Sequence, residues 1–84
     1  MPLDRRGFDE LKRAGAGRPA PDAIALLYRK AFHDHGTQAL WSRKPSHRPT
    51  IAQALVVAES LRREGDMKAR PLAVEIEAAC RAAL

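Results

Sequence analysis

Apolar residues recur at helical spacing in three segments of this 84-residue chain, and no segment alternates convincingly between apolar and polar residues as a half-buried strand would. We therefore predict an all-α protein, a small bundle of three main helices over about 22–35, 51–64 and 67–84. A short helical turn is expected near 37–42. Residues 1–21, rich in glycine, proline and arginine, should form a loosely attached basic arm beside a single helical domain over 22–84. The arm has one possible amphipathic turn over 8–13, in which Phe8 and Leu11 could touch the core.

The first main helix should begin after Asp22, which we expect to cap it by accepting hydrogen bonds from the free N–H groups of its first turn. Gly36 is placed to end this helix in a left-handed conformation, which costs glycine little. The residues at the spacing of one helical face, and therefore expected in the core, are Ile24, Leu27, Tyr28, Ala31 and Phe32.

The second main helix has the clearest start signal in the chain. Thr50 stands at its N-cap and Gln53 follows three residues later, so the two side chains can satisfy each other's backbone N–H groups as a capping box. Glu59 and Arg63 are spaced to pair on its exposed side, and Gly65 should end it. Its core face should consist of Ile51, Ala54, Leu55, Ala58 and Leu61.

The third main helix is complicated by Pro71, because a proline five positions into a helix removes a hydrogen bond and crowds the preceding turn. Two arrangements stay open: residues 67–70 form a separate tight turn, or the helix proper begins at Pro71. Glu77 and Arg81 should pair one turn apart. The apolar stripe of this helix comprises Leu72, Ile76, Ala79, Cys80 and Ala83.

The loop between these last two helices invites comparison with two known designs. Its "EGDMKA" turn looks like the joint of a tetratricopeptide-type helical pair, but the large aromatic positions of that repeat are missing, and stable arrays need about three repeats. In a DNA-reading helix-turn-helix, an alanine precedes the turn glycine by four residues, whereas Ala58 is followed by Arg62 and the glycine comes at position 65. We therefore expect a generic αα-hairpin.

The net charge of +5 is unevenly distributed. Residues 1–48 carry ten Lys/Arg against five Asp/Glu, while residues 49–84 carry five of each. A basic half joined to a neutral half indicates a scaffold with a contact surface for an acidic partner, which includes nucleic acid and acidic protein. The alternative is that a modest positive charge only keeps a small protein in solution.

The stretch "LWSRKPSHRPT" provides the candidate contact residues. Arg43, Lys44, His47 and Arg48 should be exposed and available to an anionic partner. Two roles stay open for Trp41: it stacks on a base beside these cations, or it packs into a core that is poor in aromatic residues. The stretch is in either case a connector between two helices.

No catalytic, cofactor or metal site is predicted. His33 and His35 are two residues apart and so point to different sides of a helix, and Cys80 falls within the apolar stripe, as a core cysteine would. Glu75 and Glu77 also diverge, and the glycines lack the strand and helix of a phosphate-binding loop. We expect neither an enzyme nor a cofactor.

These observations favour a non-enzymatic, cytoplasmic binding module, an oligomer or a small accessory or regulatory partner of another protein. The alternative is a basic nucleic-acid-binding regulator of the antitoxin kind that uses the N-terminal arm and the 43–48 loop. The longest uncharged run, 49–58, is too short to span a bilayer, and no export signal or small-molecule substrate is evident. The many alanines, and arginine in preference to lysine, suggest a GC-rich bacterial gene.

Overall fold

A computed structural model describes residues 7–36, 46–65 and 67–84, and every regular element within them is a helix. The predicted all-α class is confirmed. The short helical turn expected near 37–42 lies outside the described residues. No helix in these ranges is both long and apolar enough to cross a membrane. The four helices are α1 (Phe8–Gly15), α2 (Asp22–His35), α3 (Ile51–Glu64) and α4 (Ala69–Ala83).

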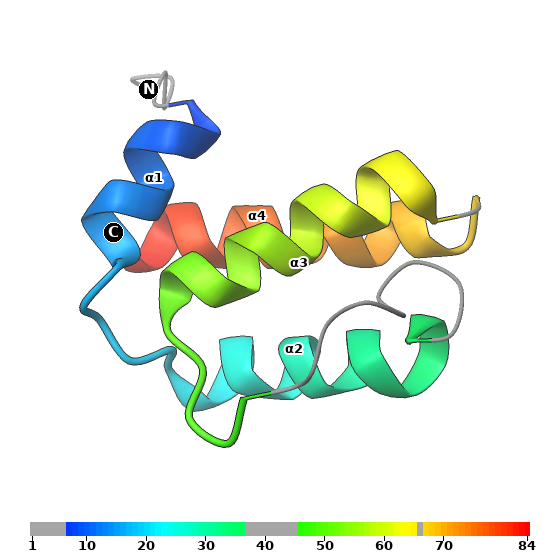
Figure 1. Cartoon of the computed structure of the whole chain (residues 1–84), viewed down its shortest axis with the longest axis horizontal. Coiled ribbons are helices and arrows are strands. Elements are labelled where there is room, and N and C mark those ends of the chain that lie inside the picture. The colour runs from blue at the N-terminus through cyan, green and yellow to red at the C-terminus, as the bar shows by residue number, and fades with distance from the viewer. Residues whose placement is uncertain (1–6, 37–45, 66) are drawn as a thin grey trace.

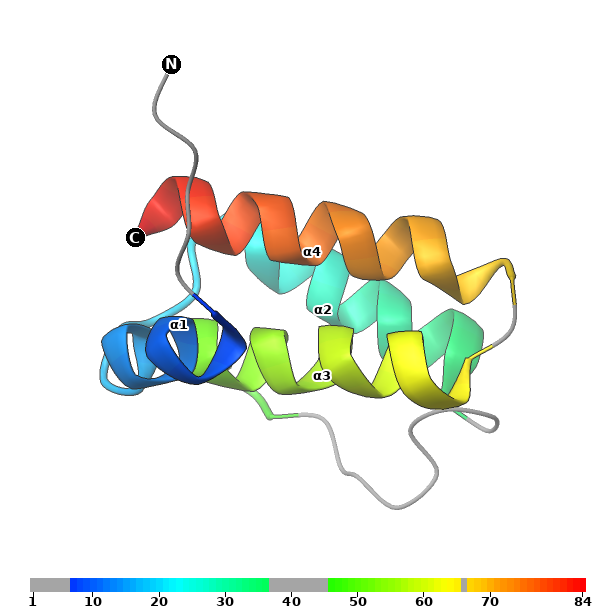
Figure 2. The ribbon, with the colours of Figure 1, turned by 90° about the horizontal axis from the view of Figure 1, so that it is seen from above.

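The pair formed by α3 and α4 lies at the centre of the arrangement. The two helices run antiparallel and side by side (Figure 1), and they share the most extensive helix–helix contact among the described residues. Helix α2 packs against one side of the pair. Helix α1 lies on the opposite side, over the end where α3 begins and α4 finishes (Figures 1 and 2).

The expected count of three main helices is corrected to four within the described residues, because residues 8–15 form a helix that belongs to the core. Leu11 is fully buried, and Phe8 packs half-buried against the same cluster. The core contacts of Phe8 and Leu11 agree with the amphipathic turn predicted at 8–13, but two large apolar residues are too weak a periodic signal to predict a complete packed helix from sequence. The expectation of a loosely attached arm therefore fails over residues 8–15, while residues 1–6 lie outside the described part.

Helix α1 is held against α3 by a close backbone approach and by an ion pair. A Cβ atom at Gly15 would lie 2.9 Å from Ile51 Cβ and 3.0 Å from the backbone nitrogen of Ala52. Lys12 Nζ donates a hydrogen bond of 2.9 Å to Glu59 Oε1. This hydrogen bond is the main reason why the pKa of Lys12 is raised. The predicted partner of Glu59 was Arg63, so sequence spacing misplaced this contact.

The capping box at the start of α3 is confirmed. The backbone N–H of Thr50 donates to Gln53 Oε1 at 2.8 Å, and the backbone N–H of Gln53 donates to Thr50 Oγ1 at 3.1 Å. Helix α3 spans the predicted residues, and all five of its predicted core residues are buried. A strong local signal thus fixes both the start and the orientation of this helix.

The ends of α2 differ from expectation although its bounds agree. Asp22 is the first helical residue rather than the N-cap, which is Pro21, and no side chain caps this end. Gly36 is right-handed, with φ −58° and ψ −38°. Its N–H donates to the carbonyl oxygen of Phe32 at 3.1 Å, so the chain continues the helical hydrogen-bond pattern and needs no left-handed residue.

Helix α4 begins two residues before Pro71, so its start is intermediate between the two predicted arrangements. Met67 and Lys68 form a turn, and Ala69 starts the helix, which places Pro71 at its third residue. The first four N–H groups of a helix have no intrahelical acceptor, so the missing N–H of this proline breaks no hydrogen bond.

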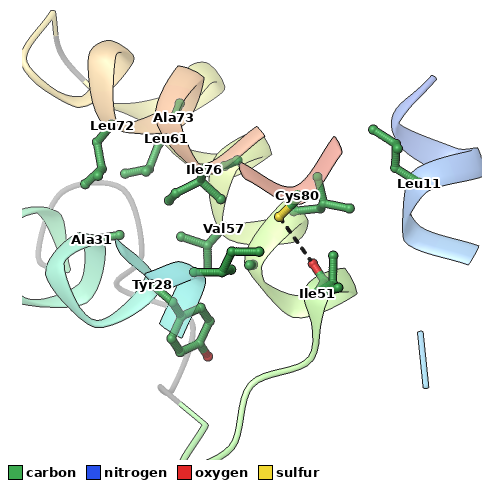
Figure 3. Close-up of a cluster of buried hydrophobic side chains, with 14 of the residues drawn as sticks. Leu11, Tyr28, Ala31, Ile51, Val57, Leu61, Leu72, Ala73, Ile76 and Cys80 are labelled. Carbon is green, nitrogen blue, oxygen red and sulfur yellow. Dashed lines mark hydrogen bonds between the residues drawn. The ribbon is translucent and has the colours of Figure 1, made fainter. Parts of the chain in front are cut away.

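The core lies between α2 and the α3–α4 pair and continues toward α1 (Figure 3). Tyr28 is buried and meets Phe32 with ring centroids 5.1 Å apart. The pair predicted between Glu77 and Arg81 is confirmed, with Arg81 Nε donating to Glu77 Oε2 at 3.0 Å. The fully or nearly fully buried aliphatic side chains of the central pair include Ile51, Leu55, Val57, Leu61, Leu72 and Ile76.

Two alanine substitutions test the packing of α1. Gly15→Ala gains helix propensity but forces Cβ against Ile51 and Ala52, so we expect a net loss of about 1–2 kcal/mol in the free energy of unfolding. Gly17→Ala is the control, because its Cβ meets no atom within 4 Å. It should be neutral or stabilising by about 0.5 kcal/mol. Urea denaturation measures both, and a Gly15→Ala variant as stable as Gly17→Ala would contradict the close approach.

Candidate functional site

Of the five predicted contact residues, His47 and Arg48 lie in the described connector before α3, and both are exposed. Trp41, Arg43 and Lys44 lie outside the described residues. Their roles, and the choice between a stacked and a buried Trp41, stay predictions.

The connector that carries His47 and Arg48 is fixed to its neighbours by hydrogen bonds. At its start, the backbone N–H of Ser46 donates to the hydroxyl oxygen of the buried Tyr28 at 2.9 Å. At its end, it runs antiparallel to residues 18–20 of the connector between α1 and α2. Two backbone hydrogen bonds of 2.9 Å join these segments, from Ala20 N–H to the Pro49 oxygen and from Ile51 N–H to the Arg18 oxygen.

This pairing brings two arginines onto adjacent segments. Arg18 and Arg48 are both exposed, and within the described part of the chain neither forms an ion pair with an acidic side chain. Sequence reasoning had assigned them to separate regions, the N-terminal arm and the later loop. The antiparallel bridge is a tertiary contact, so sequence spacing could not show that they share one end of the molecule.

A second surface lies on the side of the α3–α4 pair that carries α1. Helix α1 covers only the end of this side where α3 begins, and no described helix covers the other end (Figure 2). There the surface is hollowed, with a volume of about 310 Å³ lined by Arg62, Arg70 and Val74. We call this region the open face.

The charges of the open face are only partly neutralised. Arg62 Nη2 lies 2.9 Å from Glu77 Oε1, an ion-pair contact rather than an aligned hydrogen bond. The Arg62 guanidinium also lies 5.7 Å from the ring centroid of Phe8, within the range of a cation–π contact. Arg70 is exposed and forms no ion pair in the described part. Val74, one turn further along α4, is 54% exposed.

Sequence reasoning missed the open face. One signal was present, because Val74 is an apolar residue outside the stripe that α4 presents to the core. The other signal, the contact between Phe8 and Arg62, joins residues far apart in the sequence and could be found only in the folded chain.

A second hollow, of about 400 Å³, lies between the end of α2 and the start of α4. Its lining mixes Lys30 and Lys68 with Asp34 and Glu75, so the charges offset one another. The pKa of Asp34 is lowered, chiefly by its hydrogen bond with His33. A lining with balanced charge selects neither an anion nor a cation, so this hollow gives a weaker indication of function than the open face.

Cys80 is a core residue, as predicted. Its side chain is fully buried, and its Sγ lies 4.0 Å from the Ile51 carbonyl oxygen (Figure 3). Burial, assisted by the negative charge of Glu77, raises the pKa of the thiol to about 11. Across residues 7–36, 46–65 and 67–84, no group of His, Cys, Asp and Glu side chains is arranged to hold a metal ion.

Comparison with known protein families, with curated proteins and with solved structures finds no match to this chain. Function must therefore be inferred from the geometry and charge of the described residues.

The buried position of Cys80 predicts an unreactive thiol. At pH 8 the pKa of about 11 leaves on the order of 0.1% thiolate, and the side chain is inaccessible as well. We expect iodoacetamide to alkylate the folded chain at least about 100-fold more slowly than the same chain unfolded in urea. Mass spectrometry follows the reaction, and equal rates in the two states would show that Cys80 is not in the core.

Proposed function

We propose that this chain is a non-enzymatic helical module that binds another protein through the open face, as a small accessory or regulatory partner. The main support for this proposal is that α1 covers only one end of one side of the α3–α4 pair (Figure 2). At the other end Arg62, Arg70 and Val74 line a hollow. Arginine is enriched in protein interfaces because its planar fork can donate several hydrogen bonds at once.

Helix α1 itself supports the proposal, because it demonstrates how a short helix sits on this side of the pair. It does so with one fully buried leucine, one half-buried phenylalanine and the ion pair from Lys12 to Glu59. A partner helix placed beyond Phe8 would meet similar chemistry, an apolar side chain flanked by charges. Recognition of this kind, a helix laid in a groove between helices, is common among binding modules.

The charge of the open face favours a different protein over a second copy of this chain. A symmetric dimer through this face would bring Arg62 and Arg70 near the same residues of the second copy. The net charge of +5 on each copy adds to that repulsion. The oligomer expected from the sequence is therefore an alternative outcome, which sedimentation velocity over a range of concentrations would detect.

Photo-crosslinking in cells that express the chain tests the protein-binding proposal. We replace Val74 with p-benzoylphenylalanine and use the same replacement of Leu26 as the control. Leu26 is 63% exposed on α2, on the other side of the bundle. We expect discrete adducts from position 74 that are absent from position 26. Identical adducts from the two positions, or none from position 74, would contradict the proposal.

Nucleic-acid binding remains a second candidate, supported by the adjacent positions of Arg18 and Arg48 and by the exposed His47. These residues project from connectors that hydrogen bonds hold in place, as residues that contact a phosphate backbone need to be.

The salt dependence of duplex DNA binding tests this second candidate. Each phosphate contact contributes about −0.9 to the slope of log K against log salt concentration. Joint replacement Arg18→Gln with Arg48→Gln should therefore make the slope shallower by about two. The exposed Arg29 of α2, replaced by glutamine, is the control and should leave the slope unchanged. Absence of binding at low salt would rule this candidate out.

A further inference from the structure

Resting on the proposed protein-binding function, we propose that the segment bound at the open face is an amphipathic helix that carries carboxylates. Its apolar side would meet Val74, and its Asp or Glu residues would pair with Arg70 and with the exposed side of Arg62.

The charge of the open face identifies the sign of the partner. In the described part of the chain, Arg62 forms an ion pair with one carboxylate, that of Glu77, and the Arg62 side chain is still 45% exposed. A guanidinium has five N–H donors, so a single contact to Glu77 Oε1 leaves donors for a second carboxylate. Arg70 forms no ion pair within the described part. Two arginines line one hollow, and of the two only Arg62 contacts a carboxylate within the described part, so the hollow selects an anionic partner.

The apolar part of the open face identifies the type of segment. Arg70 and Val74 are four residues apart on α4, so they lie one above the other on the same side of that helix, about 6 Å apart along its axis. A partner helix with an apolar residue and an acidic residue at i, i+3 or i, i+4 would present its two side chains with the same separation. The hollow of about 310 Å³ is open to solvent, which suits a few side chains of a helix better than an enclosed small molecule.

A binding experiment with three synthetic peptides of 15 residues with blocked ends tests this inference. The probe has leucines at i, i+3, i+4 and i+7 with glutamates at most other positions. The second peptide replaces every glutamate by lysine, and the third contains the residues of the probe in an order without helical periodicity. Fluorescence anisotropy of labelled peptide measures the dissociation constant for the full chain at low salt and at about 0.5 M NaCl, where charge contacts are largely screened.

Matched pairs of charge-reversed variants locate the binding site. The test variant is Arg70→Glu with Val74→Glu, and the control is Leu26→Glu with Arg29→Glu, the corresponding exposed apolar and basic pair on α2. All four positions are exposed, and Arg70 lies in the first turn of α4, where a carboxylate suits the helix dipole. Circular dichroism should show that both variants keep the fold.

We expect the probe to bind the native chain with an affinity that falls at high salt. Its affinity for the test variant should be about tenfold lower, whereas the control variant should retain full affinity. The lysine peptide and the non-periodic peptide should bind far more weakly than the probe. If the lysine peptide binds best, and its affinity changes in the test variant but not in the control variant, the acidic partner is wrong but the protein-binding function stands.

Three further outcomes would overturn more than the charge assignment. Binding of the probe that weakens only in the control variant would place the site on α2 and contradict the open face. Failure of both helical peptides to bind would contradict the acidic partner together with the protein-binding function. If duplex DNA displaces the labelled probe as well as unlabelled probe does, the open face binds anions in general and does not recognise a protein helix.

Discussion

The antiparallel packing of α3 against α4 is the interaction on which the rest of the structure depends. Leu55 and Leu61 of α3 and Ile76 of α4 are fully buried, and Glu77 of α4 contacts Arg62 of α3. The other two helices each use one side of the pair, so neither could be positioned without it. Because α1 has only eight residues, it covers part of its side, and the open face is what remains.

The sequence predicted the central pair and α2 well because their signals are local. The capping box at Thr50 and Gln53 satisfies backbone groups only three residues apart, and apolar periodicity defines each buried face without knowledge of its neighbours. The burial of Cys80 and the pairing of Glu77 with Arg81 were likewise predicted from spacing alone.

What the sequence could not predict depends on contacts between distant segments. Leu11 gives little evidence of helix on its own, and it is the docking of α1 against α3 that buries it. Glu59 pairs with Lys12, 47 residues away, rather than with a residue of its own helix. The same difference between local and long-range information applies to the candidate contact residues. The exposure of Arg48 could be predicted from the local composition, but its proximity to Arg18 depends on the bridge between the two connectors. Trp41, Arg43 and Lys44 lie outside the described residues, and their roles stay predictions.

The two ends of one side of the α3–α4 pair differ, and the proposed function depends on this asymmetry. At one end α1 buries Leu11 and pairs Lys12 with Glu59; at the other, Val74 is half exposed between arginines. The most direct test is methyl NMR of the chain during titration with an acidic amphipathic helix. If the open face binds such a helix, the Val74 methyl signals should show saturable shifts while those of Leu26 stay in place. Shifts at Leu26 with none at Val74 would contradict the open face as the binding site.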